Sequence, residues 1–167
     1  MERLLNNRDG KVIDPKTYVS YERKGDVLIF AFEAYDSSLN SFSDMDNDAL
    51  YNGDVVEVFL DLGDDYYYEF EVAPNGAAFV ATIVDATPTF IDHPFFSKEV
   101  RIKGNDYFVK MAIDLSALPH RGHIKFNAFR IETKGIRPNH ILQALSPTLS
   151  ETFHTKDAFI ELKEARQ

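Results

Sequence analysis

The chain has 167 residues, of which 44% are hydrophobic, and its formal net charge is -9. This length and composition predict one domain, residues 1–167, with a substantial core. The negative charge argues against a nucleic-acid partner, because phosphate recognition depends on clustered Lys and Arg. No stretch approaches the roughly 18 apolar residues of a membrane helix, and we expect no membrane partner and no signal peptide in this chain.

Short β-rich segments separated by polar turns fill the first half of the chain. Residues 17–22 and 27–35 flank a Lys-Gly-Asp turn, which predicts an antiparallel pair. Residues 36–53 are polar and too long for a tight turn, so we expect a functional or metal-bound loop there. Strands are predicted at 55–61, 66–73 and 77–84, the last two joined by a Pro-Asn-Gly turn.

The second half continues this pattern with one further hairpin and more widely spaced strands. Residues 85–94 contain two prolines and are interpreted as an irregular connection. Strands at 100–103 and 107–114 surround a Gly-Asn-Asp turn, and 125–133 and 158–163 are predicted as later strands. Residues 116–122 and 135–139 are interpreted as loops. No segment has a sustained helical period, so the fold class expected is all-β: an antiparallel β-sandwich, jelly-roll or immunoglobulin-like.

Alternation along residues 55–72 places carboxylates on one face of the predicted sheet. The apolar positions keep period 2, so the positions between them share the opposite face. These intervening residues are Glu57, Tyr67, Glu69 and Glu71. Carboxylates beside aromatic rings are suited to a hydroxylated ligand, because rings pack on the apolar faces of a sugar while charged groups bond its hydroxyls.

The order of these segments resembles the family 9 carbohydrate-binding modules and their relatives in the wider DOMON-like superfamily. The resemblance rests on VLIFAFEAYD at 27–36, YNGDVVEVFLD at 51–61, YYYEFEVAPNG at 66–76, YFVKMAIDLSAL at 107–118, KFNAFRIET at 125–133 and LSPTLSETFHTKDAFIELK at 145–163. It implies a jelly-roll-like sandwich that binds a saccharide or oligosaccharide without cleaving it. It also implies a linked glycoside hydrolase domain, an extracellular or periplasmic location, and structural calcium.

The best-known members of that family hold a sugar between two tryptophans, and this chain has no Trp. By the resemblance, Tyr51 takes the place of the first tryptophan, and Phe153 or His154 replaces the second. The candidate carbohydrate-binding residues are therefore Tyr51, Glu57, Glu69, Arg130, Phe153 and His154. Their spacing is compatible with one sheet face, and an equally open interpretation makes Glu57 and Arg130 a structural ion pair.

A calcium site is predicted in the acidic loop, where three carboxylates alternate in the sequence and two more flank them. Calcium prefers such oxygen-rich sets, although the loop lacks the Gly and Glu positions of an EF-hand. The candidate ligands are Asp36, Asp44, Asp46, Asp48 and Asp54. The alternative is an acidic loop that is simply solvated.

Three other chemistries remain open as alternatives. His120 and His123 could hold zinc, although a surface turn accounts for them more simply because further ligands are missing. Met111, together with His120, His123, His140 or His154, could bind haem in a DOMON-like redox module, although its phase in the strand also suits the core. Glu57 and Glu69 could act as a glycosidase pair if their spacing allows it. A structural accessory domain without a ligand is the last alternative.

Overall fold

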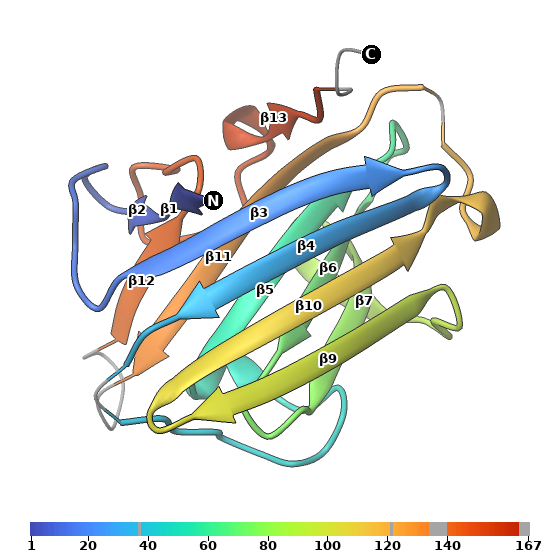
Figure 1. Ribbon diagram of the computed structural model, residues 1–167. Coiled ribbons are helices and arrows are strands. Elements are labelled where there is room, and N and C mark those ends of the chain that lie inside the picture. The colour runs from blue at the N-terminus through green and yellow to red at the C-terminus, as the bar shows by residue number, and fades with distance from the viewer. Residues whose placement is uncertain (37, 121, 134–139, 164–167) are drawn as a thin grey trace.

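The computed structural model describes residues 1–36, 38–120, 122–133 and 140–163, and its strands form two antiparallel sheets packed face to face (Figure 1). The all-β sandwich predicted from the alternating segments is therefore confirmed. The interpreted loop at 135–139 and parts of the loop at 116–122 lie outside the described residues. Among the described residues, no helix is long and apolar enough to cross a membrane.

The smaller sheet has five strands in the order β1-β3-β4-β10-β9 and forms the front layer in Figure 1. Its long strands are joined as two hairpins, with β3 beside β4 and β10 beside β9. Their bounds are β1 Glu2–Arg3, β3 Thr17–Lys24, β4 Val27–Ala34, β9 Phe96–Lys103 and β10 Asp106–Asp114.

The larger sheet has eight strands in the order β2-β12-β11-β5-β6-β7-β8, with β13 added beside β11. Their bounds are β2 Leu5–Asn6, β5 Val55–Asp61, β6 Tyr67–Val72, β7 Ala78–Val84, β8 Thr87–Phe90, β11 Lys125–Thr133, β12 His140–Ala144 and β13 Ile160–Glu161. Strands β5 and β6 are central, and all six residues of β6 are buried. A strand buried at every position must be covered on both faces of its sheet.

The main core lies between the sheets and contains the period-2 apolar positions predicted from the sequence. Phe30 of β4 and Phe126 of β11 meet across the layers with ring centroids 5.3 Å apart. Phe70 of β6 is fully buried, and its ring centroid lies 5.0 Å from that of Phe96 in β9. This interlayer core fixes which face of each strand turns away from it.

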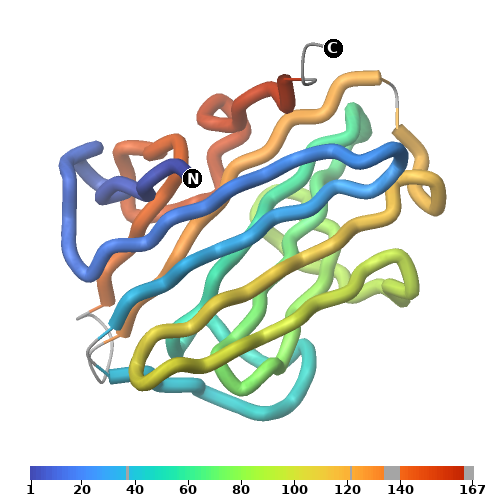
Figure 2. Tube along the Cα trace, in the orientation of Figure 1, coloured from blue at the N-terminus to red at the C-terminus, as the bar shows by residue number. Residues whose placement is uncertain are grey.

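The outer face of the larger sheet carries a second buried cluster, which the sequence did not lead us to expect. Its rings include Phe59 of β5, Tyr67 of β6 and Phe129 of β11, together with Phe153 and Phe159 from the C-terminal segment, residues 145–163. That segment lies against β11 before pairing through β13 (Figure 2). The C-terminal segment therefore covers much of the sheet face that was predicted to be hydrophilic.

The structure differs from the predicted strands in several places, and β9 begins at Phe96, four residues before the predicted start. Strand β8 was interpreted as an irregular connection because it contains Pro88 and is exposed at every position, so no burial period marks it. Strands β1 and β2 are only two residues long. Strand β12 was not predicted. The closing strand shortens to β13, preceded by the 3-10 helix η3, Lys156–Ala158.

Residues 38–53 of the polar loop cross one end of the sandwich and include the 3-10 helix η1, Leu50–Asn52, just before β5 (Figure 2). Gly53 lets the loop close on itself, because a Cβ there would lie 2.5 Å from the backbone nitrogen of Phe42 and 2.7 Å from the carbonyl oxygen of Asn40. Fully buried Leu50 anchors η1. This packing fixes the position of Tyr51.

Candidate functional site

A cavity of about 530 Å³ opens on the outer face of the larger sheet. It is formed by side chains from the central strands, from η1, from the β7–β8 turn and from the C-terminal segment. Its lining residues include Tyr51, Glu57, Glu69, Phe153 and His154. Five of the six side chains predicted to bind carbohydrate therefore surround one cavity, and ligand pockets of this size are typical of small-molecule sites.

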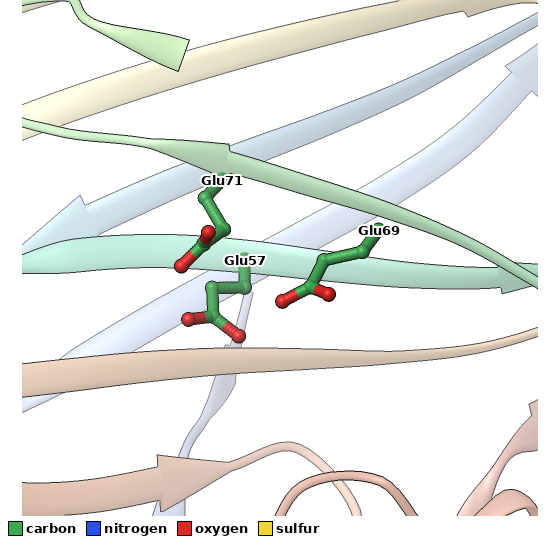
Figure 3. Close-up of side chains that lie close together, drawn as sticks. All are labelled: Glu57, Glu69 and Glu71. Carbon is green, nitrogen blue, oxygen red and sulfur yellow. The ribbon is translucent and has the colours of Figure 1, made fainter. Parts of the chain in front are cut away.

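Three glutamates lie together at this face, as Figure 3 shows. Glu57 of β5 and Glu71 of β6 are direct cross-strand partners, and Glu69 precedes Glu71 by two positions on the same face. One carboxylate oxygen from each lies within 4.8 Å of the others. Glu57 and Glu69 line the cavity, whereas Glu71 is not among its lining residues.

Burial changes the protonation of Glu69 and Glu71. Their exposed fractions are 2% for Glu57, 7% for Glu69 and 0% for Glu71. Burial, followed by the charge of Glu69, raises the pKa of Glu71 from 4.5 to about 8, and a hydrogen bond with Glu57 acts in the opposite direction. Burial, followed by the charge of Glu57, also raises the pKa of Glu69 well above its usual value. At neutral pH the Glu71 carboxyl therefore retains its proton.

Aromatic rings form the wall beside the carboxylates. Phe153 is 6% exposed and stacks on Phe129 with ring centroids 4.1 Å apart and planes at 19°. His154 stacks on Phe59 at 4.9 Å and 26°. These stacks hold the C-terminal segment against the sheet and place its side chains at the cavity.

His154 is also tied to the sheet by a hydrogen bond with Tyr67. The Tyr67 hydroxyl lies 2.5 Å from Nδ1 of His154. Burial lowers the pKa of His154, which favours the neutral imidazole. In the neutral ring, Nδ1 either accepts from the Tyr67 O–H or, in the other tautomer, donates its N–H to the Tyr67 oxygen. His154 is thereby positioned as a fixed polar group at the edge of the cavity.

Tyr51 presents the most exposed aromatic surface among the predicted ligand residues, with 37% of the residue exposed. Its position in η1 places it at the cavity without burying it in the aromatic cluster beneath. Across the site, Arg8 lines the cavity and forms an ion pair with Glu151, with Nε and Oε2 2.7 Å apart. Neither Arg8 nor Glu151 was predicted, because they lie at opposite ends of the chain.

Arg130 does not join this site, and the expectation that it shares a face with Glu57 was wrong. In the register of β11 and β5, Arg130 is opposite Val56 whereas Phe129 is opposite Glu57, so Arg130 points between the sheets. It is 0% exposed and forms an ion pair with Asp36, with Nη2 and Oδ2 2.6 Å apart. The alternative paired Arg130 with Glu57, whereas in the structure the buried ion pair of Arg130 is with Asp36.

The five aspartates predicted to bind calcium are not brought together. Asp36 is paired with Arg130, and Asp54 accepts from the backbone N–H groups of Asn40 and Thr133 at 2.6 and 2.7 Å. Asp46 accepts from the N–H of Ala78 at 2.9 Å. Asp48 accepts from the adjacent Ala49 N–H, and Asp44 is exposed.

Among the described residues, Glu57, Glu69 and Glu71 are the group of three or more His, Cys, Asp or Glu that could hold a metal. The loop carboxylates therefore do not fit a shared ligand set as placed, and calcium binding in the loop stays a prediction.

The alternative metal and haem groupings are also separated. Met111 is fully buried in the core between the sheets, opposite Phe30. His140 and His154 line the cavity on the other side of the larger sheet. His120 and His123 are exposed, and Arg121 between them lies outside the described residues. The core interpretation of Met111 is confirmed, and the haem alternative is not favoured.

Neither the protein-family models nor the curated protein sequences include a match to this chain. Solved structures do match. A candidate carbohydrate-binding protein from Bacteroides uniformis ATCC 8492 superposes with a TM-score of 0.78 at 18% identity, covering 95% of this chain and 84% of that one.

A family 9 carbohydrate-binding module from Caldicellulosiruptor kristjanssonii, in complex with glucose, has a TM-score of 0.73 at 19% identity and covers 99% of this chain and 85% of its own. A second structure of such a module from the same organism, in complex with cellotriose, has a TM-score of 0.67 at 20% identity, with coverages of 99% and 84%. The chain therefore has the fold of a family 9 carbohydrate-binding module.

Proposed function

We propose that this domain binds a saccharide, at a chain end or as a small oligosaccharide, in the cavity between Tyr51 and the C-terminal segment. The observation that carries the proposal is the meeting of an exposed aromatic ring with buried carboxylates in one cavity. A pyranose has apolar C–H faces and a polar hydroxyl edge, so it needs both kinds of contact at once. The fold shared with modules solved with glucose and cellotriose supports the same proposal.

Each part of the cavity has a distinct role in this proposal. Tyr51 packs against one face of the sugar ring, while Glu57 and Glu69 accept hydrogen bonds from its hydroxyls. His154, held by Tyr67, offers its remaining ring nitrogen. Phe153 supports the site from below, because its stacking on Phe129 leaves it only 6% exposed. Only Tyr51 offers an exposed ring face for stacking, so the ligand would be held mainly by hydrogen bonds to its hydroxyls and not between two rings.

We propose that the domain does not cleave its ligand. Glu57 and Glu69 come from adjacent strands and lie on the same face of one sheet. A glycosidase pair must flank the scissile bond from two sides, with a separation of about 5 Å in retaining enzymes and about 6.5–9.5 Å in inverting ones. The oxygens of Glu57 and Glu69 lie within 4.8 Å of each other, close to the separation of a retaining pair, so the proposal rests on the fold shared with carbohydrate-binding modules. A linked catalytic domain and an extracellular or periplasmic setting belong to this proposal.

Calorimetric titration with glucose and cellotriose tests the proposal. The wild-type protein should bind one of them, and Tyr51→Ala should weaken the affinity about tenfold or more, since one stacking ring is lost from an exposed position. Phe42→Ala is the matched control, because Phe42 is 53% exposed and does not line the cavity. Equal losses in the two variants, or none in Tyr51→Ala, would remove Tyr51 from the site.

Incubation of the protein with cello-oligosaccharides, followed by chromatography, tests the absence of cleavage. The oligosaccharides should keep their lengths. Shortened products that disappear in Glu69→Gln would replace the binding proposal with a hydrolytic one.

A further inference from the structure

The glutamate cluster at the cavity gathers three buried carboxyl groups, whose charge can be neutralised either by protons or by a bound cation. Glu57, Glu69 and Glu71 are all nearly or fully buried, with oxygens within 4.8 Å of one another. Transferring even one carboxylate from water into a protein interior is costly unless it is paired. Arg8, a basic residue lining the cavity, already has Glu151 as its partner.

Glu71 adds a second observation. Its side chain is 0% exposed, and in the described part of the chain neither carboxylate oxygen has a hydrogen-bond donor, except when a proton is shared with Glu57. Figure 3 shows this carboxylate directed toward Glu57 from the neighbouring strand. A carboxyl group can donate to another only while one of the two holds a proton. Buried polar atoms without a partner are rare in folded proteins, and a bound ion or water is one of the features that account for them.

We propose that Glu57, Glu69 and Glu71 bind a hard divalent cation of the calcium or manganese class. An all-carboxylate donor set suits such cations, whereas softer metals prefer nitrogen or sulfur ligands. Oxygens bound at about 2.3–2.6 Å to one calcium ion can be up to about 5 Å apart, which accommodates the separation within this cluster. The cation would satisfy Glu71 and offset the repulsion among the three carboxylates.

The cavity gives this cation an entry path and a second role. Glu57 and Glu69 line the cavity, so the ion would be reached from its floor. Three carboxylates leave coordination positions that water fills, and two neighbouring hydroxyls of a saccharide could replace that water. This second role rests on the proposed function, whereas binding of the cation itself does not.

The test is calorimetric titration of the chelator-treated protein with CaCl₂ and with MnCl₂, without sugar. The wild-type protein should bind one of these ions, and Glu71→Gln should weaken binding at least about tenfold, because Gln keeps the shape but removes the charge. Glu69→Gln provides a second variant if Glu71→Gln does not give a cooperative unfolding transition. Glu99→Gln is the control, since Glu99 is an exposed carboxylate on the other sheet.

Three results would overturn the inference. Wild-type protein that binds neither ion at millimolar concentration would show that the cluster is neutralised by protons alone. Equal affinities in wild type, Glu71→Gln and Glu69→Gln would place the ion elsewhere. Loss of binding in Asp44→Asn, with none in the glutamate variants, would assign it to the acidic loop.

Sugar titrations with and without chelator separate this inference from the proposed function. Sugar binding that persists in a protein unable to bind either ion contradicts the cation site alone. Cation binding that depends on Glu71, in a protein that binds no sugar, contradicts the proposed function alone.

Discussion

Replacing Arg130 by Met should strongly destabilise the protein while leaving the cavity intact. The guanidinium is fully buried between the sheets, where Nη2 donates to Asp36 and Nη1 donates to the Thr17 hydroxyl at 2.9 Å and to the Tyr35 carbonyl at 2.6 Å. Met occupies a similar volume, so the substitution removes the charge and the hydrogen bonds without opening a large cavity.

The magnitude follows from what is left behind. Breaking a buried ion pair by removing one partner costs about 3–5 kcal/mol, because the other charge stays buried without compensation. For a domain of this size each kcal/mol lowers the melting temperature by about 2–4 °C, so the expected decrease is about 6–20 °C. A double variant, Arg130→Met with Asp36→Leu, should recover part of this loss because no lone charge remains.

Urea unfolding followed by far-UV circular dichroism measures the effect, since the chain has no Trp to report by fluorescence. Lys125→Met is the control, because Lys125 lies exposed on the same strand. A loss below about 1 kcal/mol in Arg130→Met would refute the argument that the pair holds the layers together. Sugar affinity that falls in the folded variant while its stability is unchanged would return Arg130 to the binding site.

Three other predictions test the core, the acidic loop and the glutamate cluster. Phe70→Ala should reduce the free energy of unfolding by about 3–5 kcal/mol, since its fully buried ring packs against Phe96; an unchanged urea midpoint would mean that this ring is not in the core. Asp54→Ala should reduce the free energy of unfolding by about 2–6 kcal/mol with or without calcium, because the N–H groups of Asn40 and Thr133 lose their acceptor. A reduction seen only when calcium is present would instead make Asp54 a metal ligand. In chelator, the free energy of unfolding should fall as pH rises from about 4.5 to 8, because the folded state retains the Glu71 proton, with its pKa raised to about 8, after the unfolded chain has released it. The slope from this one group is at most about 1.4 kcal/mol per pH unit, and Glu71→Gln should flatten the curve measured by urea unfolding at several pH values; parallel curves would show that Glu71 does not titrate this way.

The alternation of side chains was enough to predict the sandwich and the glutamates of the candidate site, whereas Tyr51, Phe153 and His154 were predicted from the family resemblance. Period 2 along β5 and β6 assigned Phe70 to the core and the three glutamates to the opposite face, and both assignments hold in the structure. Local alternation is reliable there because each strand has direct neighbours on both sides, which fixes its register. The segments without such a pattern, β8 and β12, were missed.

What the sequence could not determine is what covers each face. Alternation shows which residues of one strand share a face, but it does not relate the faces of two different strands. The pairing of β11 with β5 places Glu57 and Arg130 on opposite faces of the sheet. Alternation also cannot show that Phe153 and His154 return to stack on Phe129 and Phe59, because no local signal encodes contacts between segments so far apart. The sequence alone thus determined the layers and the sign of the charge at the site. Tertiary packing decided that these carboxylates are buried. The C-terminal segment covers the outer face of the larger sheet and excludes water from side chains that an isolated strand would leave exposed.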